Sequence, residues 1–178
     1  MNLPLIYSST QWHDYWKRMV PASQREQRRG NHIADLIAAD GCVVEIQHAS
    51  MSPTKIMGRE LDHGHMVWIW DGRSAYASGA ILLTAFADGI VSFRWKNQRR
   101  NLRTCRRPYF LDLWRLGETG ERVLLKVDIL NEDGTGSGQL VTHDIMRLWI
   151  VSGLPRRPLA ELPEGSGIPS VKLAAAVA

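Results

Sequence analysis

The chain has 178 residues, 44% of them hydrophobic, and a formal net charge of +4, which suits one globular domain of ordinary size. No apolar run approaches the roughly 20 residues that cross a bilayer, and no basic segment followed by an apolar stretch marks a secretory signal. We therefore expect a cytoplasmic protein without a membrane partner. Cys42 and Cys105 form no CxxC pair, which argues against a zinc-ribbon or redox motif.

The first expected element is a helix over residues 10–20. Large side chains recur on one of its faces at helical spacing and predict core packing: Trp12, Tyr15, Trp16 and Met19. His13 and Lys17 lie one turn apart on another face. Residues 21–31 are polar and indicate a solvated loop or a short helix, with Glu26 as an acid among several arginines.

Two apolar runs flank Asp40-Gly41 and predict a β-hairpin, because Gly adopts positive φ at little cost. With a three-residue loop centred on Asp40, Asp35 lies opposite Glu45, and Gln47 shares the face of Glu45. Opposed carboxylates repel each other unless a cation lies between them, and a hard divalent cation prefers oxygen ligands. The alternative is a wetted face of an ordinary hairpin. Apolar neighbours on both faces favour a central strand pair, where lone carboxylates are costly.

After this hairpin, Ser52-Pro53 predicts the start of a helix that ends near His63, with Gly64 as its terminator. Residues 66–70 then form a strand that is too apolar for a sheet edge. A strand–helix–strand passage of this kind predicts a parallel crossover. The expected fold class is therefore α/β, with a mixed central sheet and flanking helices.

The C-terminal half adds antiparallel β-hairpins, with predicted strands at residues 81–86, 90–96, 110–116 and 123–130. Residues 131–138 read as a Gly-rich loop, which cannot be a phosphate-cradling loop because no GK[ST] follows. A last helix is expected over residues 142–151. Residues 1–154 thus form a single predicted domain with a hairpin and basic elaboration at residues 80–130, and residues 155–178 form a tail or arm.

A run of seven cations with no acid among them begins in the predicted strand 90–96 and ends before the predicted strand 110–116: Arg94, Lys96, Arg99, Arg100, Arg103, Arg106 and Arg107. Such cations repel one another unless solvent or an anion intervenes. Since Arg binds phosphate in a bidentate manner, the expected partner is a nucleic-acid backbone, DNA or RNA, bound with steep salt dependence. The alternative is a solvated basic loop.

Several motifs, in a fixed order, resemble one known family. They are Trp12-His13, Trp16-Lys17, Glu26, His32-Ile33-Ala34-Asp35, Glu45-Ile46-Gln47-His48, Ser52-Pro53, Arg59-Glu60 and Trp68-Ile69-Trp70-Asp71. Together they resemble the nuclease domain of CoiA-like competence proteins, which belong to the PD-(D/E)xK, restriction-endonuclease-like superfamily. The resemblance covers roughly residues 12–71 and implies a restriction-endonuclease-like core at about residues 10–71.

The resemblance implies a metal-dependent nuclease that hydrolyses phosphodiester bonds of DNA. The implied ligands of Mg²⁺ or Mn²⁺ are Asp35, Glu45 and the carbonyl of Ile46. The implied catalytic residues are Glu26, Asp35, Glu45 and Gln47, and the supporting residues are His13, Lys17, His32 and Arg59. Gln47 stands where the superfamily usually has Lys, and an amide carries no charge. The metal, a second metal, Lys17 or His13 must then supply the missing function, or the site is slow.

A second interpretation is a non-catalytic nucleic-acid-binding protein on a nuclease-like fold, acting in DNA uptake, recombination or repair. The basic run and Gln47 suit it, whereas two uncompensated acids do not. Members of the competence type carry a further Cys-containing region that these residues lack, so a role in repair, phage or restriction biology is as well supported as competence. A homodimer is compatible with either interpretation.

Overall fold

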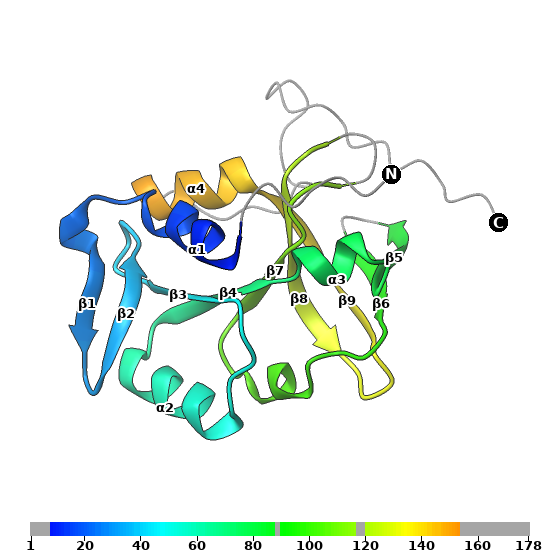
Figure 1. Cartoon of the computed structure of the whole chain (residues 1–178), viewed down its shortest axis with the longest axis horizontal. Coiled ribbons are helices and arrows are strands. Elements are labelled where there is room, and N and C mark those ends of the chain that lie inside the picture. The colour runs from blue at the N-terminus through cyan, green and yellow to red at the C-terminus, as the bar shows by residue number, and fades with distance from the viewer. Residues whose placement is uncertain (1–7, 88–89, 117–119, 154–178) are drawn as a thin grey trace.

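The computed structural model describes residues 8–87, 90–116 and 120–153. Its strands form one sheet of nine, in the order β1-β2-β3-β4-β7-β8-β9-β6-β5 (Figure 1). The strands are β1 Arg25–Arg29, β2 His32–Ile37, β3 Val43–Gln47, β4 Met66–Asp71, β5 Ile81–Ala87, β6 Ile90–Trp95, β7 Tyr109–Asp112, β8 Val123–Leu130 and β9 Thr135–Thr142. The pairs β3–β4 and β4–β7 are parallel, and the other pairs are antiparallel. The predicted α/β class with a mixed sheet is therefore confirmed.

Helices cover both faces of the sheet. The helical elements are α1 Ser9–Lys17, η1 Ala22–Gln24, α2 Pro53–His63, α3 Arg73–Ala77, η2 Arg100–Thr104 and α4 His143–Ser152. Figure 1 shows α1 and α4 on one side of β3 and β4, and α2 on the other. Two apolar clusters match these sides, because Trp12 and Trp16 of α1 pack with Trp149 of α4, whereas Ile56 of α2 packs with Trp68.

The capping residues at the ends of α2 and α4 predicted these two helices correctly. Ser52 caps α2 by accepting a hydrogen bond from the Lys55 N–H, and Gly64 ends the helix with a φ of 65°. The parallel pairing of β4 with β3 confirms the predicted crossover. Thr142 caps α4 in the same way as Ser52 caps α2. At α1 the cap is Ser8, in a capping box with Gln11, two residues before the expected start.

Two segments differ from their predicted structure. Residues 21–31, expected as a loop or short helix, contain the edge strand β1, which pairs with β2. Residues 131–138, expected as a Gly-rich loop, contain a turn and the first half of β9. The glycines of β9 serve close strand packing, since a Cβ on Gly138 would lie 2.0 Å from the Lys126 carbonyl oxygen, and one on Gly136 would lie 2.4 Å from that of Ile129.

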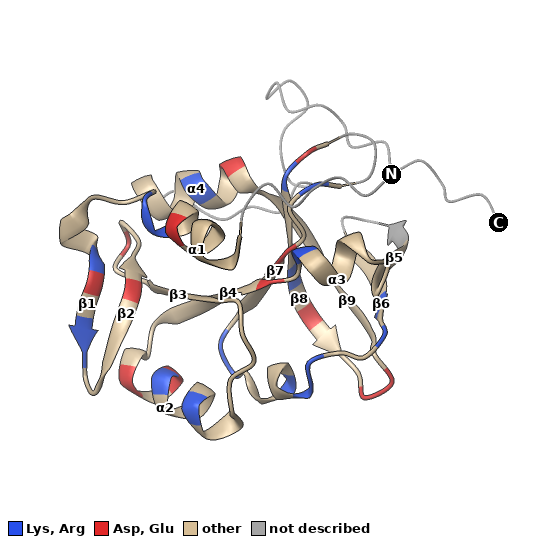
Figure 2. Cartoon of the chain, in the orientation of Figure 1, with Lys and Arg blue, Asp and Glu red and all other residues tan. Residues whose placement is uncertain are grey.

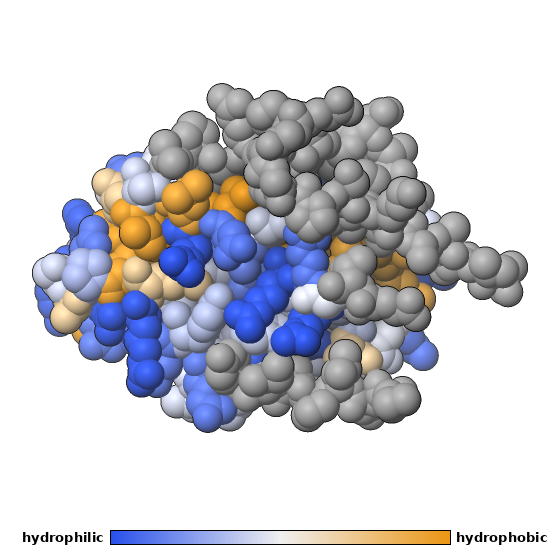
Figure 3. Space-filling view, turned by 90° about the horizontal axis from the view of Figure 1, so that it is seen from above, coloured by the Kyte–Doolittle hydropathy of each residue, from blue (hydrophilic) through white to orange (hydrophobic). Residues whose placement is uncertain are grey.

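The hairpin β5–β6 confirms the prediction for residues 81–96. β7 and β8 form the predicted antiparallel pair, but β7 ends at Asp112, four residues earlier than predicted. The sequence also predicts a hairpin turn at Asp88-Gly89, between the strands 81–86 and 90–96. This turn and the predicted tail over residues 155–178 lie outside the described residues. Among the described helices, none has the length and apolar character needed to cross a membrane. Seen from the side of α1 and α4, the surface has an apolar area beside a hydrophilic one (Figure 3), and Leu148 and Val151 of α4 are both exposed.

Candidate functional site

The two acids expected to share a face contact helices on opposite sides of the sheet. Asp35 on β2 faces the last turn of α1, and Glu45 on β3 faces α2. The ladder between β2 and β3 pairs Leu36 with Val44 and Ile37 with Val43, and it does not extend to Asp35 and Glu45. The prediction that these carboxylates lie opposite each other on one face is therefore wrong.

An irregularity in β2 explains the separation. Strict alternation would place Ala34 and Leu36 on one face, yet Ala34 packs in the cluster on the α2 side and Leu36 in the cluster on the α1 side. The β1–β2 pairing is interrupted at the same level, where Glu26 has a φ of 50°. A local break of this kind turns a side chain away from the face that its position in the sequence predicts.

Asp35 is the centre of a partly exposed cluster on the α1 side. One carboxylate oxygen accepts a hydrogen bond from the Ile46 N–H at 2.8 Å. The other lies 3.3 Å from His13 Nε2 and 3.9 Å from Lys17 Nζ. Lys17 also binds Glu26 at 2.6 Å. Burial raises the pKa of Asp35, but the hydrogen bonds from His13 and Ile46 outweigh it and hold the pKa below its ordinary value.

Glu45 belongs to a separate, more deeply buried cluster on the α2 side. Its side chain is 2% exposed, with one oxygen 2.6 Å from Arg59 Nη1 and the other 2.7 Å from His63 Nε2. Arg59 also donates to the Ile33 carbonyl oxygen at 3.3 Å. A carboxylate enclosed in this way is compensated by its two basic neighbours, so it needs no metal ion to be tolerated in the core.

These contacts bear directly on the Mg²⁺ or Mn²⁺ that the family resemblance implies. Asp35, Glu45 and Ile46 do not form a joint oxygen site, because the two carboxylates face different helices on opposite sides of the sheet. Within the described ranges, no group of three or more His, Cys, Asp or Glu side chains is arranged to hold a metal ion. The residues present therefore do not fit the implied ion as that set of ligands.

The other predicted site residues divide between the two sides. His13, Lys17 and Glu26 gather at Asp35, whereas Arg59 lies at Glu45. His32 lies on the α2 side with its Nδ1 atom 2.7 Å from Asp62, and its ring centre is 6.1 Å from that of His63. The Gln47 amide donates to the Ala49 carbonyl oxygen.

The seven predicted phosphate-binding cations lie in β6, η2 and the connections around them. Six of them are exposed: Arg94, Lys96, Arg100, Arg103, Arg106 and Arg107. Arg99 is only partly exposed, and burial lowers its pKa. Arg103 pairs with Glu132 at 2.9 Å. Figure 2 shows Lys and Arg residues along η2, on its connections to β6 and β7, and on α2.

A buried acid that the sequence did not single out holds this basic segment in place. Glu60 of α2 is 5% exposed and accepts hydrogen bonds from the Arg106 N–H at 3.0 Å and the Arg107 N–H at 3.1 Å. The same carboxylate accepts the Trp68 indole N–H at 3.0 Å. Because Glu60 binds the backbone, the side chains of Arg106 and Arg107 stay exposed to solvent.

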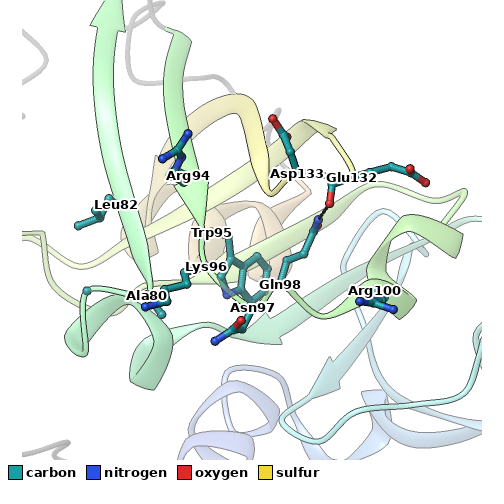
Figure 4. A pocket seen from close by; sticks show the side chains of 11 residues that line it. Ala80, Leu82, Arg94, Trp95, Lys96, Asn97, Gln98, Arg100, Glu132 and Asp133 are labelled. Atoms are coloured by element: carbon teal, nitrogen blue, oxygen red, sulfur yellow. Dashed lines mark hydrogen bonds between the residues drawn. The ribbon is translucent and has the colours of Figure 1, made fainter.

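A pocket of about 610 Å³ adjoins the start of the basic segment (Figure 4). Arg94, Lys96 and Arg100 lie on its rim and point in different directions, and Glu132 and Asp133 line the side formed by the β8–β9 turn. Hydrogen bonds from Thr135 lower the pKa of Asp133, and the positive charge of the nearby Arg94 lowers it further. Opposite charges at one rim give the pocket little net charge, and its cations do not converge on a single anion.

A second buried acid, Asp112 on β7, ties α1 and α4 to the sheet. It is completely buried and accepts the indole N–H groups of Trp12 at 2.8 Å and Trp16 at 3.0 Å. His143 Nε2 lies 2.9 Å from its other oxygen. Burial raises the pKa of Asp112, but the charge and hydrogen bond of His143, with hydrogen bonds from the Trp12 indole and the Trp114 backbone N–H, outweigh it and lower the pKa overall.

Sequence reasoning missed Glu60, His63 and Asp112. Glu60 lies in a weak apolar stripe with Ile56, Met57 and Leu61 in the sequence, but Met57 and Leu61 are exposed while Glu60 is buried. The spacing of Glu60 one turn after Ile56 was a usable signal, because both lie on the buried face of α2. His63 and Asp112 gave no such signal, since their partners come from distant segments.

Comparison with known protein families, characterised proteins and solved structures finds no match for this chain. The resemblance to CoiA-like nuclease domains stays a prediction.

Proposed function

We propose that this protein binds nucleic acid through the basic segment 94–107, on an α/β fold of the restriction-endonuclease-like type. The observation that supports the proposal is the exposure of six cations on a segment whose end, at Arg106 and Arg107, is fixed by the buried Glu60 carboxylate. Fixed backbone lowers the entropy that ordering the segment on a ligand would cost. Arginine side chains bind phosphate in a bidentate manner.

Trp95 and Tyr109, the aromatic residues that flank the segment, are buried in the core. The cations, and not aromatic stacking, are therefore expected to supply the affinity. Five exposed cations remain when Arg103 is set aside for its contact with Glu132. If each contacts one phosphate of a duplex, the logarithm of the association constant falls against the logarithm of salt concentration with a slope of about −4.5.

The test is the binding of a fluorescently labelled 14-base-pair DNA duplex, measured by anisotropy between 50 and 200 mM NaCl. From these five contacts alone we expect at least about a 500-fold loss of affinity over this range. The double variant Arg106→Ala, Arg107→Ala should bind about 60-fold more weakly at 0.1 M salt. The matched control is Arg18→Ala with Lys126→Ala, which removes two charges from α1 and β8. Absence of wild-type binding at 50 mM salt would refute the proposal.

A second candidate function is phosphodiester hydrolysis at the Asp35 cluster. The observation that favours it is the convergence of His13 and Lys17 on one carboxylate oxygen of Asp35, with all three side chains partly exposed. In this proposal His13, oriented by Asp35, accepts the proton of a water that attacks phosphorus, and the Lys17 ammonium stabilises charge on the phosphate. The bond from phosphorus to the leaving sugar oxygen breaks, and that oxygen takes the proton from the His13 imidazolium. Lys17 thus supplies the charge that Gln47 lacks.

Cleavage of plasmid and single-stranded DNA distinguishes this second candidate from binding alone. The reaction is followed with Mg²⁺, with Mn²⁺ and with EDTA, for the wild-type protein and for Asp35→Ala and Lys17→Met. Hydrolysis that both substitutions abolish supports the second candidate. DNA that stays intact in every reaction while the duplex still binds eliminates hydrolysis and leaves the binding proposal in place.

A further inference from the structure

A second basic element lies beside α2, on the β1–β2 hairpin. Arg28 and Arg29 at the end of β1 are both exposed. The turn that follows them is fastened to α2, because Asp62 accepts a hydrogen bond from the Asn31 N–H at 2.9 Å and lies 2.7 Å from His32 Nδ1. The end of the hairpin is therefore held in a fixed position against the helix.

Gly30 shows how closely the hairpin approaches α2. Its φ is +58°, and a Cβ at this position would lie 2.9 Å from Cγ of Asp62. Only glycine fits both the left-handed backbone and the contact. The hydrogen bonds and this close approach define one geometry for the hairpin relative to the helix.

On the other flank, α2 contacts the basic segment. Glu60 binds the backbone of Arg106 and Arg107, and Asn101 of η2 donates to the carbonyl oxygen of Met51, just before the helix. The helix itself contributes Lys55, which is exposed. We call this surface the basic band; its residues are Arg28, Arg29, Lys55, Arg100, Arg106 and Arg107. Figure 2 shows its cations on the end of β1, on α2 and along η2.

The strand order gives the separation of β1 and β7 at right angles to the strands. The two strands are separated by β2, β3 and β4. Four strand spacings correspond to about 19 Å. Phosphates along one strand of a duplex repeat every ~3.4 Å along the axis, so this separation corresponds to about six base pairs. A rigid duplex can contact both ends of the basic band without losing conformational entropy. A flexible single strand loses conformational entropy when it binds in the same way.

We infer that double-stranded DNA is the ligand and that it lies across α2, with Arg28 and Arg29 as a second contact point beyond the basic segment. This inference rests on the proposed nucleic-acid binding and deepens it. It assigns to β1 a role in affinity that neither the family resemblance nor the basic run 94–107 supplies.

The test compares a labelled 14-base-pair duplex with the single strand of the same length, by anisotropy at several salt concentrations. We expect the wild-type protein to prefer the duplex by at least about tenfold at 0.1 M salt. Arg28→Ala with Arg29→Ala should weaken duplex binding about 60-fold and reduce the magnitude of the salt slope by about 1.8, as expected for two lost phosphate contacts. The control Arg18→Ala with Lys126→Ala should bind as the wild-type protein does.

Two results would overturn the inference. One is a duplex affinity for the Arg28, Arg29 double variant equal to that of the wild-type protein, although the Arg106, Arg107 double variant binds weakly. The other is a single strand that binds as tightly as the duplex. In both cases the proposed function survives, because the basic segment still binds. Failure of the wild-type protein to bind either probe would instead remove the proposed function and this inference together.

Discussion

Replacing Glu60 tests whether one buried carboxylate holds the basic segment in place. Three donors converge on it: the Trp68 indole N–H and the backbone N–H groups of Arg106 and Arg107. Hydrogen bonds to a charged acceptor contribute about 1.5–3 kcal/mol each, and a buried donor left without an acceptor costs about 1–3 kcal/mol. Trp68 is completely buried, so water cannot replace the lost acceptor. We expect Glu60→Ala to lower the free energy of unfolding by about 4 kcal/mol.

Glu60→Gln is the matched variant. Its amide keeps one oxygen that can accept from the same donors, but the bonds lose their charge assistance, which roughly halves their strength. We expect a loss of about 1.5 kcal/mol. Urea unfolding monitored by tryptophan fluorescence measures both values. Duplex binding by the folded Gln variant should also weaken, because Arg106 and Arg107 are less well fixed.

The reasoning on Glu60 is refuted if Glu60→Ala unfolds within 1 kcal/mol of the wild-type protein, which is about the contribution of one ordinary hydrogen bond. It is also refuted if the Gln and Ala variants are equally destabilised, since the retained oxygen would then have no effect. Leu61→Ala is the control, because Leu61 is a neighbouring helix residue with a highly exposed side chain and should change stability very little.

Two further predictions concern the buried acid of β7 and the glycines of β9. The pKa of Asp112 is lowered in the folded protein, so its contribution to stability is present above the ordinary value of 3.8 and is lost as the pH falls through the lower folded value. Asp112→Asn should therefore flatten the acid side of the stability curve, which thermal unfolding between pH 2 and 7 would measure; an unchanged pH dependence would contradict the assignment. Gly138→Ala should destabilise the sheet by about 3 kcal/mol, because the new Cβ would lie 2.0 Å from a backbone oxygen of β8. If the Gly138→Ala variant were as stable as the wild-type protein in urea unfolding, β8 and β9 would be free to move apart. Gly41→Ala is the comparison variant, because open space surrounds its Cβ position and only the backbone effect of the substitution remains.

Elements whose signals are local were predicted well from the sequence. Ser52-Pro53 and Gly64 set the ends of α2, and Thr142 sets the start of α4. Caps of this kind act on N–H and carbonyl groups within four residues, so the sequence contains the whole interaction. The apolar run of β4 likewise indicated a central strand, and β4 lies between β3 and β7.

The composition of the site depended on contacts between distant segments. His13, Lys17, Glu26 and Asp35 do meet, as the family resemblance implied. Glu45 does not join them, because an irregularity where Glu26 has positive φ breaks the alternation of β2. Alternation predicts the face of a side chain only while the ladder is regular, and nothing local in the sequence marks where it stops.

The sequence by itself therefore determined α1, α2 and α4, most strands, the parallel crossover and the positive charge of the segment 94–107. Only the tertiary structure decided that Asp35 and Glu45 lie on different sides of the sheet and that Glu60 anchors the cations. The physical reason is the distance along the chain between the groups that interact. Helix caps and apolar periodicity are fixed by neighbours along the chain, whereas the partner of a buried charge is whichever group the packing of distant strands and helices brings within hydrogen-bond reach.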